Sequence, residues 1–169
     1  MKKFALFFLA ISIASFMNAQ TPYTTAPDEK TGGIILTGVI NKYTLQNHPD
    51  FNWYASSQKS YKPSINIVNA FEAAKSSVHF ILFGGSWCDD TQFILPKFFK
   101  LQELSGFPDS SISFFGVDRD KKTLGNISAA FQITNVPTII VMKGGKEIGR
   151  VVEYGKTGNW DSELKELLK

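Results

Sequence analysis

Residues 78–104 read VHFILFGGSWCDDTQFILPKFFKLQEL, and this stretch decides the fold. Residues 78–83 are apolar except for His79, and an uninterrupted apolar run is typical of a strand covered on both faces in a parallel sheet. A glycine pair ends the run. Apolar residues at helical spacing then predict a helix over 88–104, which Pro96 should kink.

The sequence on either side predicts an α/β protein with a central mixed sheet flanked by helices. Its elements follow the order β-α-β-α-β-α-β-β-α, in which the βαβ portion favours a parallel strand pair. Strands are expected over 34–40, with a bulge at Gly38, and over 111–117, 138–142 and 147–152. Helices are expected over 63–76, over 123–131, and after Asn159 as N-cap, while Gly144 and Gly145 predict a hairpin turn.

The first 19 residues have the layout of a secretory signal peptide. Lys2 and Lys3 precede an apolar run over 4–17, and Ala19 is a small residue suited to cleavage. An uncleaved membrane anchor is the alternative, and the run disfavours it because it is shorter than the about 20 residues that a membrane crossing needs. We expect export to the periplasm or the extracellular space, with no membrane span after cleavage. Losing two lysines lowers the net charge from +3 to +1, which gives nucleic acid no general attraction.

The rest of the chain divides into an N-terminal extension over 20–62 and a main domain over 63–169. Residues 20–33 are rich in Thr, Pro and Gly, and we expect a flexible leader there. The extension also holds an aromatic cluster, which we interpret as a lid over one edge of the core rather than a ligand site. Its members are Phe51, Trp53, Tyr54 and Tyr61.

Cys88 is the single cysteine of the chain, and it stands where the predicted central strand turns into a helix. One cysteine excludes a self-contained disulfide framework and a multi-cysteine metal cluster, and we expect no cofactor. Unpaired N–H groups at a helix start favour negative charge, so a thiolate is stabilised there. A second element, Val136-Pro137-Thr138, precedes a strand, and Pro137 is a candidate for a cis peptide bond.

With these elements in place, residues 63–169 resemble the thioredoxin-like superfamily. Trp87-Cys88 matches the start of its Trp-Cys-x-x-Cys motif, Pro96 follows Cys88 by eight residues as the family's kinking proline does, and Val136-Pro137-Thr138 matches its cis-proline loop. The resemblance implies a thioredoxin fold and thiol–disulfide exchange in cell redox homeostasis. It implies Cys88 as the nucleophile, and a substrate groove shaped by Trp87, Asp89, Val136 and Pro137.

Three departures from the family pattern bear on function. Thr91 occupies the position of the second, resolving cysteine, so an intramolecular dithiol cycle is impossible. Leu82 stands where many thioredoxins keep a buried Asp. Asp89 and Asp90 replace the usual Gly-Pro pair, and two carboxylates beside the sulfur should oppose its ionisation.

These departures leave two main hypotheses. In the first, Cys88 works alone on a client protein or a small-molecule disulfide, an external thiol or reductase releases it, and the Thr91 hydroxyl assists as a weak donor. In the second, the protein is a redox-inactive module that binds a peptide or partner in the same groove. A peroxidase of the peroxiredoxin type is disfavoured because that family's Pro-x-x-x-Thr-x-x-Cys approach to the thiol is missing.

Four other features are given structural interpretations. His79 begins its strand and Cys88 follows the far end, so a Cys–His pair is not expected. His48 is assigned to a solvated turn, and the charged run 118–122 to a solvated loop rather than a metal site. Asn126 opens a formal glycosylation sequon that we assign to an ordinary helix segment.

Overall fold

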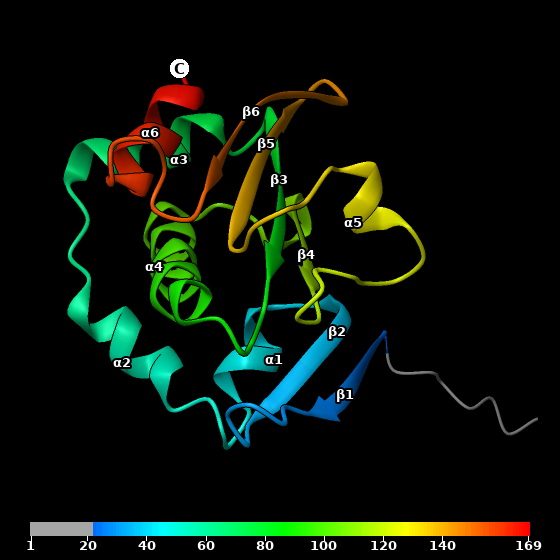
Figure 1. Cartoon of the computed structure of the whole chain (residues 1–169). Coiled ribbons are helices and arrows are strands. Elements are labelled where there is room, and N and C mark those ends of the chain that lie inside the picture. The colour runs from blue at the N-terminus through cyan, green and yellow to red at the C-terminus, as the bar shows by residue number, and fades with distance from the viewer. Residues whose placement is uncertain (1–21) are drawn as a thin grey trace, which may run out of the picture.

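A six-stranded mixed sheet in the order β1-β2-β4-β3-β5-β6 forms the centre of the computed structural model, which describes residues 22–169 (Figure 1). The strands are β1 Tyr23–Pro27, β2 Ile34–Ile40, β3 Val78–Gly84, β4 Ile112–Gly116, β5 Thr138–Lys143 and β6 Lys146–Val152. The helices are α1 Lys42–Gln46, α2 Trp53–Ser60, α3 Ile65–Ala74, α4 Asp89–Ser105, α5 Ile127–Ala130 and α6 Trp160–Leu167, with a short 3₁₀ helix at Asp109–Ser111. β3 and β4 are parallel, and β5 and β6 form an antiparallel hairpin, as predicted.

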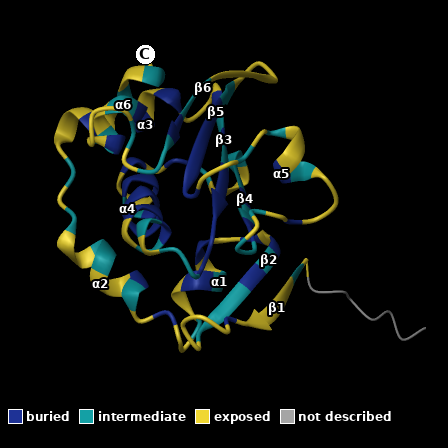
Figure 2. Ribbon diagram, in the orientation of Figure 1, coloured by how far each residue is buried: buried dark blue, intermediate teal, exposed yellow. Residues whose placement is uncertain are grey.

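Strand β3 is covered on both faces, as its uninterrupted apolar run indicated. Phe80 and Leu82 belong to the larger hydrophobic cluster, which includes residues of α3, α4 and α6. Phe83 belongs to a second cluster, against which residues of and beside α5 pack. Figure 1 shows α4, α3 and α6 on one side of the sheet and α5 on the other, and Figure 2 shows β3 as buried. Alternation along the strand therefore sends successive side chains into two separate cores.

Two element predictions need correction. Helix α5 is only four residues long. Gly125, which precedes it, adopts a left-handed conformation (φ 53°), so the helix cannot begin at residue 123. Asn159 precedes α6 as expected, but its side chain donates to the Thr157 carbonyl instead of capping the helix. Helix α4 continues through Pro96 from Asp89 to Ser105.

The N-terminal segment differs most from expectation. Residues 23–27 form β1 and pair antiparallel with β2, so they are not a flexible leader. Strand β2 in turn pairs antiparallel with β4, which extends the central sheet. The predicted bulge at Gly38 is absent, because the β1–β2 register is unbroken up to Gly38 and the β2–β4 register continues from it without a shift. Gly38 instead allows a close approach, since a Cβ there would lie 2.5 Å from the Pro22 carbonyl oxygen.

The aromatic cluster of the extension covers one edge of the core, as predicted. Phe51 and Tyr54 are buried in the larger cluster, and Trp53 and Tyr61 pack against it. The predicted signal peptide lies in residues 1–21, outside the described part of the chain. Within residues 22–169, no helix is long and apolar enough to cross a membrane.

Candidate functional site

Cys88 lies at the N-cap of α4, directly after the loop that leaves β3 (Figure 1). Its backbone is extended (φ −98°, ψ 122°), and its side chain is half-buried. The thiol donates a hydrogen bond of 3.2 Å to the carbonyl of Val136, and the Val136–Pro137 peptide bond is cis. The fold thus joins the two elements that the sequence singled out, although 48 residues separate them.

Two carboxylates directly follow Cys88 at the start of α4. Asp89 and Asp90 occupy the first helical turn, and Asp89 is exposed to solvent. Tyr154, which follows β6, is 38% exposed, and its ring lies 5.8 Å from that of Phe93. Burial and the neighbouring Asp90 carboxylate raise the pKa of Tyr154. Sequence reasoning missed Tyr154, because only the fold brings the end of β6 to the start of α4.

Thr91 faces the interior rather than the sulfur. It is buried, and its hydroxyl accepts a hydrogen bond of 3.2 Å from the Gly85 N–H. Its methyl group fills the space beside Gly84, where an added Cβ would lie 3.0 Å from it. One turn into α4 this position points at the core, so Thr91 braces the loop before Cys88. The Thr91 hydroxyl thus bonds the Gly85 N–H, and the predicted contact to the thiolate is wrong.

The position of the buried Asp found in many thioredoxins is apolar here. Leu82 is fully buried in the larger hydrophobic cluster. Its partners are core side chains, so no carboxylate stands behind the thiol at this position.

Trp87 is held by contacts from the loop after β4. Its indole Nε1 donates to the Val117 carbonyl at 3.0 Å, and the Arg119 guanidinium carbon lies 4.9 Å from the ring centroid. Arg119 itself forms a two-bond ion pair with the buried carboxylate of Asp28. The prediction that residues 118–122 form a solvated loop is therefore wrong for Arg119. The partner that orders it lies 91 residues away in sequence, where no local pattern could reveal it.

Ser86 attaches the loop after β3, which also carries Trp87, to β2. Its hydroxyl donates to the Ile34 carbonyl at 2.6 Å and accepts from the Leu36 N–H at 3.1 Å. One side chain thus satisfies a donor and an acceptor of β2, as a neighbouring strand would. Ser86, directly before Trp87, and Arg119, which lies against the Trp87 ring, are consequently both tied to the N-terminal hairpin.

The remaining candidates lie elsewhere. His79 bonds to Ser113 at 2.9 Å at the start of β3, and burial lowers its pKa. His48 stacks on Phe51 with ring centroids 4.4 Å apart, so it is packed in its turn rather than freely solvated. Asp118 accepts from the backbone N–H of Lys122 and caps its own turn. Over residues 22–169, no group of three His, Cys, Asp or Glu side chains is placed to hold a metal ion.

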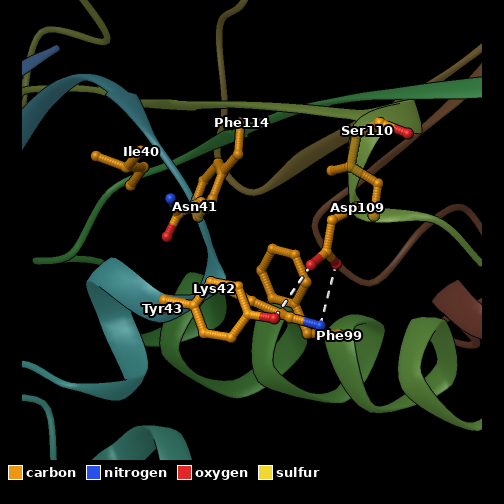
Figure 3. A pocket seen from close by; sticks show the side chains of 9 residues that line it. Ile40, Asn41, Lys42, Tyr43, Phe99, Asp109, Ser110 and Phe114 are labelled. Carbon is orange, nitrogen blue, oxygen red and sulfur yellow. Dashed lines mark hydrogen bonds and ion pairs between the residues drawn. The ribbon is translucent and has the colours of Figure 1, made fainter.

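A cavity of about 290 Å³ opens at another place, where β2 leads into α1 (Figure 3). Phe99 and Phe114 line its apolar side, and Lys42 and Asp109 form an ion pair of 3.1 Å on the polar side. Burial acts to lower the pKa of Lys42, but Asp109 and Glu103 outweigh it and raise the pKa. The ion pairs balance the positive charge of Lys42. The residues lining this cavity include none of those around Cys88.

A cysteine that caps the helix after the central strand and faces a cis-proline loop defines a protein of the thioredoxin-like class. The family model described as Thioredoxin matches residues 62–166. The chain therefore belongs to the thioredoxin family.

Two sequence relatives agree with this assignment. A thioredoxin of Staphylococcus haemolyticus is 30% identical over 86 residues, which cover 51% of this chain and 78% of that protein. A thioredoxin-like protein of Acanthamoeba polyphaga mimivirus is 33% identical over 76 residues, and the match spans 45% of this chain and about half (53%) of the viral protein. Among solved structures, oxidised thioredoxin O1 from Arabidopsis thaliana is 29% identical with a TM-score of 0.41, over 60% of this chain and 89% of that one.

Proposed function

We propose that the protein is an exported thiol–disulfide oxidoreductase that works through Cys88 alone. The observation that carries the proposal is the placement of the Cys88 sulfur, half-buried at the N-cap of α4 and 3.2 Å from the carbonyl of the cis-proline loop. The helix start favours the thiolate, and the position beside Val136 leaves the sulfur accessible to a disulfide bound along that loop.

The reaction consists of two exchanges. The Cys88 thiolate attacks one sulfur of a substrate disulfide, a bond forms between them, and the other sulfur leaves as a thiolate. An external thiolate, such as that of a low-molecular-weight thiol, then attacks the mixed disulfide and releases Cys88 unchanged. The electron pair that reduces the substrate therefore comes from the external thiol. Thr91 in place of a second cysteine supports this dependence, because no resolving sulfur exists in the chain.

The hydrogen bond from Cys88 to Val136 sets a condition on this chemistry. Only the neutral thiol can donate to a carbonyl, so ionisation breaks the bond and leaves the sulfur facing a partial negative charge. Asp89 and Asp90 oppose ionisation as well. These contacts favour a second candidate, a redox-inactive protein that binds an extended peptide at the cis-proline loop. The two candidates differ in whether Cys88 forms mixed disulfides at neutral pH.

The deciding experiment follows the release of a peptide from its mixed disulfide with glutathione, with and without added reduced glutathione. We expect one turnover per molecule without the added thiol and repeated turnover with it, and no reaction in a Cys88→Ser control. A Thr91→Cys variant should release free glutathione as well as the peptide without added thiol, because its second thiolate can displace glutathione from Cys88 and close an intramolecular disulfide. An inert wild-type protein would overturn the proposed enzyme and leave the binding module.

Export is proposed on the sequence of residues 1–19. Expression of the full chain with its native start, followed by mass measurement of the secreted or periplasmic product, tests it. We expect a mature chain beginning at Gln20. A product that retains Met1 and stays with the cells would contradict export.

A further inference from the structure

The carboxylate of Asp28 is buried in the turn between β1 and β2, and Arg119 contacts it from the loop after β4. Asp28 is 2% exposed, and its two oxygens accept from Arg119 Nε at 2.8 Å and Nη2 at 2.7 Å. The Thr31 hydroxyl and the Lys30 N–H also donate to it. The Arg119 guanidinium, first among these donors, holds the pKa of Asp28 well below its usual range. This fork-to-fork geometry leaves the guanidinium little freedom to turn.

The orientation fixed by Asp28 places Arg119 against the residue that precedes the reactive sulfur. Its guanidinium carbon lies 4.9 Å from the centroid of the Trp87 ring, a cation–π distance. The Asp28 hydrogen bonds raise the pKa of Arg119, and a smaller electrostatic interaction with Cys88 acts in the same direction. Lys121 lies 5.8 Å from the same ring.

The positive charge of Arg119 counteracts the effect of other groups near Cys88. Asp89 and Asp90 approach from α4, the Tyr154 phenol from the end of β6, and the Val136 carbonyl from the cis-proline loop. The two carboxylates and the carbonyl disfavour a thiolate. A cation held at a fixed distance therefore matters more here than beside a thiol free of carboxylates.

We propose that Asp28 and Arg119 are positioning residues for the Cys88 reaction. The N-terminal hairpin fixes Arg119 against Trp87, so that the positive charge of Arg119 favours the Cys88 thiolate over the thiol that is bonded to Val136. The inference rests on the proposed monothiol function. Asp28 lies outside residues 62–166, the part matched by the family model, so this device belongs to the extension of this chain. It assigns a task to the hairpin that β1 and β2 form.

The test is the rate of Cys88 alkylation by iodoacetamide across pH 5 to 10, measured on the purified full chain and on variants. Arg119→Gln should move the pH midpoint upward and slow alkylation at pH 7 by about three- to tenfold, since the charge is lost. Arg119→Lys keeps the charge without the fork and should recover part of the rate. Both variants should keep the wild-type circular dichroism.

Asp28→Asn separates positioning from simple charge. Loss of a negative charge near the site would by itself favour the thiolate and lower the midpoint, whereas release of Arg119 from its clamp raises it. We expect the midpoint to rise and the Trp87 fluorescence to change. Glu147→Gln is the matched control, because Glu147 forms an equivalent two-bond pair with Arg150 that does not contact Trp87.

The outcomes distinguish the two proposals. A wild-type protein that alkylates but never exchanges with a mixed disulfide would defeat the proposed function, while the Arg119 effect on the midpoint would still be measured. A wild-type protein that exchanges normally, with the Arg119 and Asp28 variants matching it in midpoint and rate, would overturn the positioning role. A lowered midpoint in Asp28→Asn would also overturn it.

Discussion

The Ser86 hydroxyl connects the reactive loop to the N-terminal hairpin, and removing it should loosen both. It bonds the Ile34 carbonyl at 2.6 Å and the Leu36 N–H at 3.1 Å, and Ser86 is buried. Two neutral hydrogen bonds are worth about 0.5–1.5 kcal/mol each, and a buried group left unpaired costs about 1–3 kcal/mol. Ser86→Ala should therefore lower the free energy of unfolding by about 2–3 kcal/mol.

Urea denaturation followed by fluorescence measures this loss, and amide hydrogen exchange localises it. Exchange at Leu36 should accelerate more than exchange at Phe80 in β3, because the hairpin opens before the central sheet does. The exposed Ser110→Ala change serves as the control and should stay within about 0.5 kcal/mol of wild type. A Ser86→Ala loss below about 0.5 kcal/mol, with Leu36 exchange unchanged, would refute the bridging role.

Three further predictions follow from the core and the sheet. Phe80→Ala should lower the free energy of unfolding by about 3–5 kcal/mol in urea denaturation, because the centroid of its fully buried ring lies 4.9 Å from that of Phe107 and 5.1 Å from that of Phe98. Phe93 is 45% exposed, so Phe93→Ala should cost far less. Equal losses would contradict the burial argument. Gly84→Ala should cost about 1–3 kcal/mol by thermal unfolding, since the new Cβ would lie 2.7 Å from a Leu95 methyl; an unchanged Tm would show that Leu95 can move freely. Burial lowers the pKa of His79 below its usual value of about 6.5, so the unfolded chain binds the proton first and the free energy of unfolding falls as the pH drops through 6.5. His79→Gln should flatten that fall between pH 7 and 5 in urea titrations, and a slope equal to wild type would assign it to other groups.

The local sequence predicted the elements that local physics decides. The run over 78–83 is apolar except for His79, so it favoured a strand covered on both sides, and Phe80 and Phe83 do enter different cores. The cis peptide at Pro137 and the meeting of Cys88 with Val136 followed from the resemblance to the family, since spacing alone does not bring residues 48 apart in sequence together.

Each error comes from a contact that the local residue pattern does not encode. Residues 23–27 lack a strong strand pattern, yet they form β1 because β2 offers a free edge. Arg119 sits in a run of charges that is typical of solvent, and its buried partner Asp28 is 91 residues away. Thr91 was assigned to the sulfur by its position in the motif, but the turn of α4 directs it to Gly85.

The sequence by itself therefore determined the class of fold, the position of the single thiol at a helix start and the absence of a second, resolving cysteine, because these depend on residue identity and short-range periodicity. Only the tertiary structure decided which groups surround that thiol. Asp28, Arg119 and Tyr154 come from three separate parts of the chain. Asp28 holds Arg119 against Trp87, the residue before the thiol, and Tyr154 interacts with Asp90 at the start of α4. No local pattern encodes these long-range contacts.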